Sequence, residues 1–265
     1  MQTLPVKAAE HITYQFNISG LEQAEFENIL SRFQSASILE SLKSTPLISV
    51  ANLNSRVISD MDLLQQILRA EGYYGATIIE QLSRQGNHYE ITLNITPGPV
   101  YSYDVIKIEY QGEQPDADIR EKVIDALGIK NDEPARAQPV ISSQDNILIL
   151  LPQMGYPFVE NIDSDFVVDH RTQTMNVTFT IETGMRRRMG SLTFEGLRTV
   201  DAKFINKFIN WREGDYFEQH YIDELRDRII KTNLFAGVNI DLLPAELDKV
   251  DITVHHIEAK HKTIG

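Results

Sequence analysis

Few side chains in this sequence could do chemistry, and the best candidates are carboxylates. Asp163 and Asp165 stand two residues apart in IDSDF, a spacing that could offer oxygen ligands to Ca²⁺. The stretch lacks the glycine and the distal glutamate of an EF-hand loop, so we expect an ordinary solvated strand face. His255 and His256 are adjacent in an alternating run, and therefore point to opposite faces and cannot share one metal.

Catalytic motifs are missing from the sequence. It contains no nucleophile elbow, phosphate-binding loop or dinucleotide fingerprint. It also has no cysteine, which excludes thiolate catalysis and cysteine metal sites. We therefore expect no enzymatic activity, no cofactor and no metal.

Basic side chains gather at one place, where Arg186, Arg187 and Arg188 follow one another. The chain has 25 basic and 38 acidic residues and a net charge of -13, which would repel nucleic acid phosphates. We therefore expect no nucleic acid partner. The three arginines could hold an acidic partner or set the angle between neighbouring units of the chain, and the alternative is a solvated linker.

Three stretches resemble one another: RAEGYYGAT at 69–77, LPQMGYPFV at 151–159 and KTNLFAGV at 231–238. Their markers recur after 83 residues, from Gly72 to Gly155, and after 78 residues, from Gly155 to Asn233. This period fits a small domain rather than a solenoid unit. Glycine and asparagine tolerate the left-handed conformation that ends many helices, and an apolar stripe with helical spacing precedes each marker. Each marker is therefore expected to end a helix.

Two alternating apolar runs follow every marker and are joined by a polar turn, as in a β-hairpin. The second runs are alike, since ITLNITPG at 91–98 matches VTFTIETG at 177–184. The order of each unit is strand, helix, helix, strand, strand, which predicts an α+β fold with two helices on one face of a small sheet. Pro152 leaves one element open: residues 147–151 are expected to be helical with a kink or early end at the proline, but could form a buried strand.

This order in tandem resembles the polypeptide-transport-associated (POTRA) domains of outer-membrane assembly proteins. GMRRRMGSLTFEGL at 184–197 is similar to the family's boundary between two domains, and WREGDYFEQHYIDELRDRIIKTNLFAGVNI at 211–240 is similar to its second helix and the corner that follows. The resemblance implies three tandem POTRA domains, at 12–98, 99–184 and 185–260, each with two helices on a mixed three-stranded sheet. Asn233, where glycine is usual, and Pro152 depart from the family pattern.

Three such domains, with GYY in the first, are most similar to the TamA family. That resemblance implies an arm on the periplasmic face of the bacterial outer membrane. Its partners would be a TamB-like protein anchored in the inner membrane, client outer-membrane polypeptides, and the arm's own C-terminal barrel. The alternatives are the arm of a BamA-like protein, that of a two-partner-secretion transporter, and a periplasmic scaffold with no barrel.

Both ends of the sequence suggest a part of a longer protein. The start has no basic and apolar signal-peptide regions, and the sequence stops where the family's barrel would begin. The longest apolar run, at 147–151, is too short to span a bilayer as a helix. We therefore expect this part to be soluble by itself.

A small sheet with helices on one face leaves edge strands whose backbone N–H and C=O groups lack partners. An extended polypeptide can add a strand there, so we expect partner binding at the edges. In the family the first hairpin strand is the outer one, which implies docking at Thr77, Ile78, Ile79, Glu80, Val159, Glu160, Asn161, Ile162, Val238, Asn239, Ile240, Asp241 and Leu242. The alternative is that these edges meet solvent or a neighbouring unit. The implied inter-domain linkers contain Gly98, Val100, Gly184, Arg186, Arg187 and Arg188.

Overall fold

The computed structural model describes residues 12–45, 47 and 49–258. The expected α+β fold is confirmed, because the order strand, helices, strand, strand occurs three times along the chain. We call each sheet with its helices a module. Residues 259 and 260, the end of the third predicted domain, lie outside the described residues.

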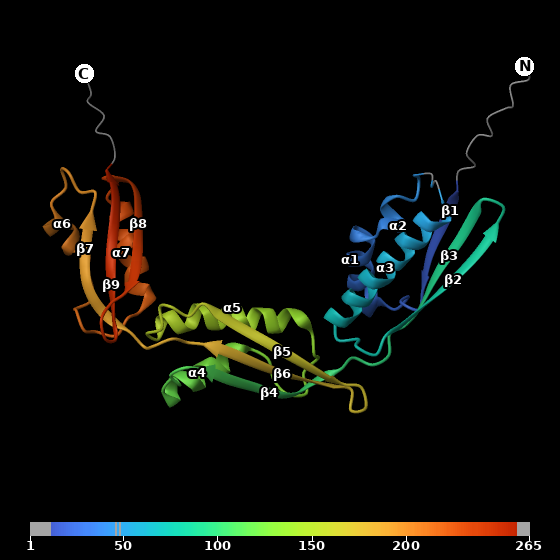
Figure 1. Cartoon of the computed structure of the whole chain (residues 1–265), viewed down its shortest axis with the longest axis horizontal. Coiled ribbons are helices and arrows are strands. Elements are labelled where there is room, and N and C mark those ends of the chain that lie inside the picture. The colour runs from blue at the N-terminus through green and yellow to red at the C-terminus, as the bar shows by residue number, and fades with distance from the viewer. Residues whose placement is uncertain (1–11, 46, 48, 259–265) are drawn as a thin grey trace, which may run out of the picture. The chain divides into compact units, whose positions relative to one another are not determined.

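The first module begins with β1 (Thr13–Ser19) and ends with the hairpin of β2 (Thr77–Gln85) and β3 (His88–Thr96). Between them lie the 3-10 helix η1 (Ala24–Phe26) and the helices α1 (Glu27–Ala36), α2 (Ile38–Ser41) and α3 (Val50–Ala70). Strand β3 is parallel to β1 and antiparallel to β2. Its apolar residues alternate with polar ones and are buried against the helices, on one side of the sheet (Figure 1).

A buried carboxylate joins two helices of the first module. Asp60 on α3 is 1% exposed and accepts hydrogen bonds from the Ser37 hydroxyl and from the backbone N–H groups of Ile38 (2.9 Å) and Leu39 (3.0 Å). The first N–H groups of a helix have no partner inside that helix. Asp60 therefore stabilises the start of α2 from a neighbouring helix.

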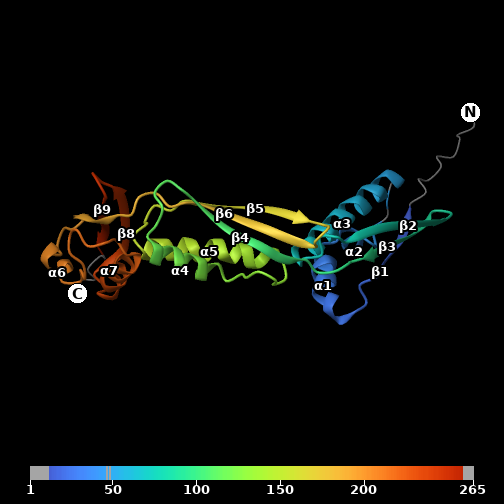
Figure 2. The same cartoon turned by 90° about the horizontal axis from the view of Figure 1, so that it is seen from below.

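The middle module comprises β4 (Ser102–Gln111), α4 (Ala117–Leu127), α5 (Ala137–Gln153), β5 (Asn161–Asp169) and β6 (Thr174–Glu182). Figure 2 shows α4 and α5 together on one side of its sheet. Residues 147–151 are helical, so the alternative of a buried strand is wrong. Helix α5 ends one residue after Pro152. The proline lacks the N–H that would bond to the carbonyl of Leu148, and the helix ends with the next residue, as the expected early end predicts.

The third module comprises β7 (Arg188–Glu195), α6 (Ala202–Asn206), α7 (Gln219–Lys231), β8 (Phe235–Pro244) and β9 (Lys249–Glu258). Strand β9 is parallel to β7 and antiparallel to β8, and its buried Val250, Ile252 and Val254 share a core with α7. Phe204, Ile205, Phe208 and Ile209 have helical spacing, but α6 ends at Asn206. Phe208 lies beyond its end and still packs against the core.

The strand orders are β1-β3-β2, β4-β6-β5 and β7-β9-β8, so the last strand of each module is the central one. The repeat markers end their helices in left-handed conformations, with φ of 95° at Gly72, 101° at Gly155 and 57° at Asn233. The expectation for all three markers is confirmed.

Contacts between Cα atoms separate the described chain into two compact units. The first contains the described residues up to Ile106 together with 130–139 and 166–177, and the second contains 107–129, 140–165 and the described residues from 178 onward. This division passes through the middle module. The predicted domain boundaries after residues 98 and 184 therefore stay predictions.

Candidate interaction edges and linkers

The first strand of each hairpin lies at an edge of its sheet, as expected, because β2, β5 and β8 each have one neighbour. The residues that the structure places in these strands are Thr77, Ile78, Ile79, Glu80, Asn161, Ile162, Val238, Asn239, Ile240, Asp241 and Leu242. Strands β1, β4 and β7 form the opposite edges, which the sequence reasoning did not consider. Strand addition at any of these edges stays a prediction.

Two residues predicted for the middle edge lie outside it. Val159 and Glu160 precede β5, which starts at Asn161. Phe158 packs against the core of the third module, and the guanidinium carbon of Arg187 lies 5.8 Å from the centre of its ring. This contact holds the chain in an irregular path after the Gly155 marker, so the strand begins later than the repeat indicates.

Edge strand β2 is open to solvent along most of its length, with eight of its nine residues exposed. The register with β3 places Leu82 on the helix-covered face, opposite Ile91, and Ile79 on the other face, opposite Asn94. Ile79 is 65% exposed and Leu82 is 43% exposed, so each face of this edge offers an apolar side chain. Glu80 and Arg84 are its only charged residues. Few charges leave an edge open to pairing.

Edge strand β5 is covered more closely. The side-chain amide of Gln144, on α5, donates to the carbonyl oxygen of Ile162 at 2.7 Å and to the hydroxyl of Ser164 at 3.3 Å. Asp163 and Asp165 are exposed on the same strand. Charged side chains and covering groups protect edge strands from pairing, so this edge is less available than β2.

Edge strand β8 carries side chains that are bonded to their own sheet. His255 of β9 lies between two carboxylates, with its Nδ1 3.2 Å from Glu195 of β7 and its Nε2 3.0 Å from Asp241 of β8. Asn239 donates its amide to Asp241 at 2.6 Å. The neighbouring His256 points to the covered face and is 5% exposed, which confirms the expected alternation.

The first linker is hydrogen-bonded to the Gly72 marker. The backbone N–H of Tyr101 donates to the carbonyl oxygen of Gly72 at 2.9 Å. A Cβ atom on Gly72 would lie 3.0 Å from Cγ1 of Val100, and the φ of Gly72 is left-handed, so both the contact and the backbone favour glycine here. Gly98, which precedes this hydrogen bond in the chain, has a left-handed φ of 71°.

The second linker repeats this arrangement on the Gly155 marker. The backbone N–H of Arg187 donates to the carbonyl oxygen of Gly155 at 2.7 Å, and a Cβ atom on Gly155 would lie 2.9 Å from Cγ of Arg186. Gly184, which precedes this hydrogen bond in the chain, has a left-handed φ of 65°. The repeated glycine therefore has the same role in both modules: its carbonyl receives the linker that follows.

Arg186, Arg187 and Arg188 have partners within the chain, and Arg188, predicted for the linker, is the first residue of β7. Arg186 pairs with Asp116 at 2.7 Å, and Arg188 pairs with Asp248 at 3.1 Å. The guanidinium carbons of Arg186 and Arg188 lie 3.9 Å and 4.1 Å from the centre of the Tyr216 ring, as in cation–π contacts. Arg187 donates to the carbonyl oxygen of Leu247 at 3.1 Å. These contacts differ from a solvated linker and favour a role in holding the junction.

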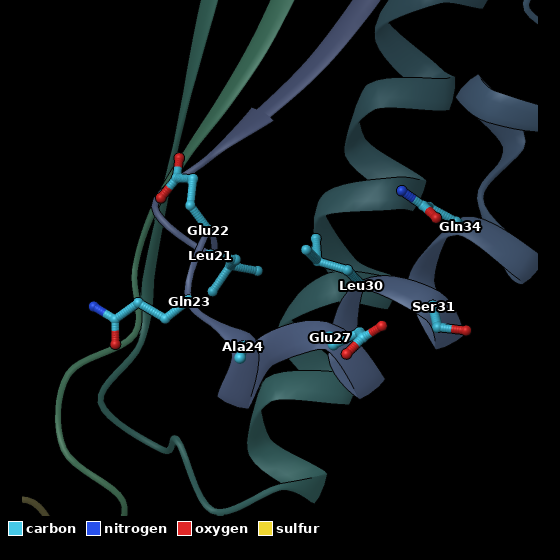
Figure 3. Close-up of a pocket in the computed structure, with 8 residues that line it drawn as sticks. All are labelled: Leu21, Glu22, Gln23, Ala24, Glu27, Leu30, Ser31 and Gln34. Atoms are coloured by element: carbon cyan, nitrogen blue, oxygen red, sulfur yellow. The ribbon is translucent and has the colours of Figure 1, made fainter.

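A hollow of about 410 Å³ lies in the first module between the segment after β1 and helix α1 (Figure 3). Leu21 and Leu30 line its apolar part, and the carboxylates of Glu22 and Glu27 lie at its rim. The backbone N–H of Gly20 donates to Glu22 at 2.7 Å and lowers the pKa of that carboxyl below its usual value. None of the lining residues belongs to a hairpin, so the hollow is separate from the predicted docking edges.

Metal clusters and membrane-spanning helices are absent from the residues that the structure describes. Among these residues, no group of three or more histidine, aspartate or glutamate side chains is placed to hold a metal ion. No described helix combines the length and the apolar character that crossing a membrane requires.

No protein-family model matches this chain. Among curated proteins, the outer membrane protein assembly factor BamA of Nitratidesulfovibrio vulgaris is 26% identical over 167 residues. The match covers 62% of the chain and 21% of that protein, so the chain spans about a fifth of the length of this relative.

Two crystal structures share the fold. POTRA domains 3–5 of BamA from Haemophilus influenzae align with a TM-score of 0.51 and 17% identity, over 96% of this chain and all of that one. BamA from Haemophilus ducreyi lacking POTRA domains 1–3 aligns with the same TM-score and identity, over 60% of this chain and 30% of that one. The chain therefore has the fold of tandem POTRA domains. The relatives named here are BamA proteins, and the finer resemblance to the TamA family stays a prediction.

Proposed function

We propose that this chain is the periplasmic arm of an outer-membrane protein of the BamA superfamily, and that it holds other polypeptides without catalysing a reaction. The POTRA fold, together with the sequence similarity to BamA, supports this assignment. The main observation behind this proposal is the free edge of β2, a nine-residue strand with an exposed apolar side chain on each face. Such an edge fits an extended polypeptide that adds one strand to the sheet.

We infer that β2 is the main docking strand and that β5 and β8 contribute less. At β5, Gln144 already occupies a backbone acceptor, and two aspartates carry like charges along the strand. At β8, the outward Asn239 and Asp241 are bonded to each other, and Asp241 also pairs with His255. A partner strand would have to compete with these groups at β5 and β8. On β2, Ser83 donates to Glu90 and Gln81 accepts from Asn94, both on β3, but no described helix side chain is bonded to a backbone carbonyl of β2.

Two partners fit this proposal. A TamA-like arm would dock a TamB-like protein anchored in the inner membrane, and client outer-membrane polypeptides in addition. A BamA-like arm would hold lipoproteins and unfolded barrel proteins, and the similarity of the sequence to BamA favours this second candidate. Capture of interacting proteins from a bacterial envelope extract, identified by mass spectrometry, separates the two: one large TamB-like protein in the first case, small lipoproteins and barrel proteins in the second.

Proline substitutions test the edge itself. The N–H groups of adjacent residues in a strand point to opposite sides, so one of Ile78→Pro and Ile79→Pro removes a bond to β3 and the other removes a donor at the free edge. The variant that keeps its thermal stability should lose most of its captured partner. On β8, the N–H of Ala245 donates to Lys249, and Asn239 and Asp241 lie an even number of residues before Ala245, so their N–H groups also face β9 and proline at either position should destabilise the sheet. Val238→Pro and Leu242→Pro remove donors at the free edge and provide the matched comparison on β8, where we expect loss of docking through the third module with the fold retained.

The contrary result is equally clear. If the stable β2 variant captures as much partner as the unchanged chain, strand addition at β2 is excluded. If neither it nor the β8 variants reduce capture, the sheet edges do not bind the partner.

A further inference from the structure

A small pocket in the first compact unit is lined by Arg69, Tyr74, Val168 and His170 and has a volume of about 220 Å³. Arg69 lies in the last turn of α3, and His170 lies in the turn between β5 and β6. The ring of Tyr74 lies 5.7 Å from that of Tyr101, which in turn lies 5.8 Å from the His170 ring. Aromatic rings and a valine thus form a mainly apolar wall.

Arg69 has no ion-pair partner among the residues that the structure describes. The nearest acidic residue along the chain, Glu71, is already bound by Arg32 at 2.6 Å and lies 3.6 Å from Arg136. The guanidinium keeps its positive charge at any physiological pH. Burial raises the pKa of Tyr74 and the charge of Arg69 opposes that rise, so the charge acts at the pocket. Arg69 is exposed, so its charge is open to an anion that enters the pocket from solvent.

The other polar groups of the pocket are donors as well. Tyr101 is 3% exposed, and its hydroxyl lies 2.9 Å from Nδ1 of His170, its single partner within the described chain. We assign the tyrosine as the donor in this bond, because its proton has no other acceptor there. With Nδ1 as the acceptor, the N–H of the ring is at Nε2 and can donate to a ligand. The hydroxyl of Tyr74 is a further donor.

We propose that this pocket binds a carboxylate attached to a single apolar group. The guanidinium and the donors would bind the carboxylate oxygens, and the aromatic rings and Val168 would contact the apolar group. The volume is below the roughly 300 to 1,000 Å³ of sites for drug-sized ligands, so the pocket suits one side chain rather than a larger molecule.

Two sources could supply such a group. One is the C-terminal residue of a polypeptide. A strand that pairs antiparallel with β2 would point its C-terminus toward Thr77, three residues after Tyr74. This source alone depends on the proposed function. The other source is a free short-chain acid.

Titration followed by NMR of the Tyr74 and His170 ring signals tests the proposal. N-acetyl-leucine supplies the carboxylate of a chain end, N-acetyl-leucinamide is the same molecule without the charge, and 4-methylpentanoate represents the free acid. We expect saturable binding of the carboxylates and about tenfold weaker binding of the amide, because a charge-assisted hydrogen bond contributes roughly 1.5 to 3 kcal/mol. Tighter binding of N-acetyl-leucine than of 4-methylpentanoate indicates the chain end, and the reverse order indicates the free acid.

Arg69→Gln should weaken carboxylate binding about tenfold. Arg84→Gln, which removes an exposed arginine of the same module outside the pocket, should leave it unchanged. Equal affinity for acid and amide, or the same affinity in both variants, would overturn the proposal. These probes bind without strand addition, so the result is independent of whether β2 docks a partner.

Discussion

Alanine at the glycine after the first strand of each module should destabilise the outer two modules far more than the middle one. Gly20, Gly112 and Gly196 have similar left-handed φ values of 93°, 90° and 84°. A Cβ atom would lie 1.9 Å from the carbonyl oxygen of Ile95 at Gly20 and 2.2 Å from that of His256 at Gly196, but would meet nothing within 4 Å at Gly112. The three sites thus share the backbone strain, and two of them add a clash with the central strand.

The magnitudes follow from these two contributions. A left-handed conformation costs an L-residue about 1 to 2 kcal/mol, and alanine regains about 0.4 to 1 kcal/mol by restricting the unfolded chain. Gly112→Ala should therefore cost about 1 kcal/mol or less. Relieving the clash should cost about 1 to 3 kcal/mol more, as in overpacked cores, so Gly20→Ala and Gly196→Ala should cost about 2 to 4 kcal/mol.

Urea denaturation measures these costs. Trp211 is the only tryptophan of the sequence and belongs to the core of the third module, so its fluorescence reports on that module. Gly196→Ala should lower the midpoint of the tryptophan transition, whereas Gly112→Ala should barely change hydrogen exchange of the β6 amides, which report on the middle module. Hydrogen exchange of the β3 amides reports on Gly20→Ala in the first module. Equal losses of unfolding free energy for all three variants would refute the role of the close approach.

Three further predictions concern buried or junction residues. Asp60→Ala should lower the unfolding free energy of the first module by about 3 kcal/mol, because three donors lose their acceptor. Asp62→Ala, on the exposed face of the same helix, should change this free energy little. Equal losses of the two variants in urea denaturation would contradict this prediction. Tyr216→Leu should increase hydrogen exchange at residues 185–188 and lower the unfolding free energy reported by Trp211 by about 1 to 2 kcal/mol, because the ring makes the cation–π contacts. Tyr216→Phe keeps the ring and should leave the exchange and the unfolding free energy unchanged. A lower unfolding free energy in the phenylalanine variant would rule this out. Burial raises the pKa of Tyr103 from 10 to about 12, so the folded state holds this proton more tightly, and the resulting stability is complete below pH 10 and is lost as the pH rises toward 12. Tyr103→Phe should therefore lose less stability than the unchanged chain when the pH rises above about 10. If the urea midpoint falls by the same amount in both proteins between pH values below and above about 10, the pKa of Tyr103 does not contribute to the alkaline destabilisation.

Local patterns predicted most of the fold. The alternation of apolar and polar residues at 91–95 predicts the second strand of the hairpin, and the stripe before each marker predicts the helix that the marker ends. These features depend on residues a few positions apart, where the periods of strands and helices are directly visible. The order of elements followed from them, and the tandem repetition supported the edge position of β2, β5 and β8.

The contacts that join distant segments could not be predicted in this way. Arg186 and Arg188 stand out as part of a basic run, but their shared partner Tyr216 lies about thirty residues away, and the equivalent position of the middle module holds Pro134 instead of an aromatic residue. The bond between Tyr101 and His170 spans 69 positions. Gln144 covers an edge strand from a helix, and no spacing rule connects the two. Such pairings depend on how sheets and helices pack, which one sequence does not reveal.

Residues that look alike in the repeat also differ in their surroundings. The start of β5 was placed too early, because Phe158 packs against the third module. The signal that could have found this difference is Pro157, which directly precedes Phe158 and has no counterpart in the first copy. A proline at that point disfavours an immediate strand with a full set of backbone hydrogen bonds.

Amide hydrogen exchange of the first module with a captured partner bound is the most direct test of strand addition at β2. In a strand that gains a neighbour, the amides that face the free edge become protected, and these are every second residue. We therefore expect new protection at alternate residues of β2 between Thr77 and Gln85, with β5 and β8 little changed. New protection confined to the helices, with β2 exchanging as it does in the free chain, would contradict the account.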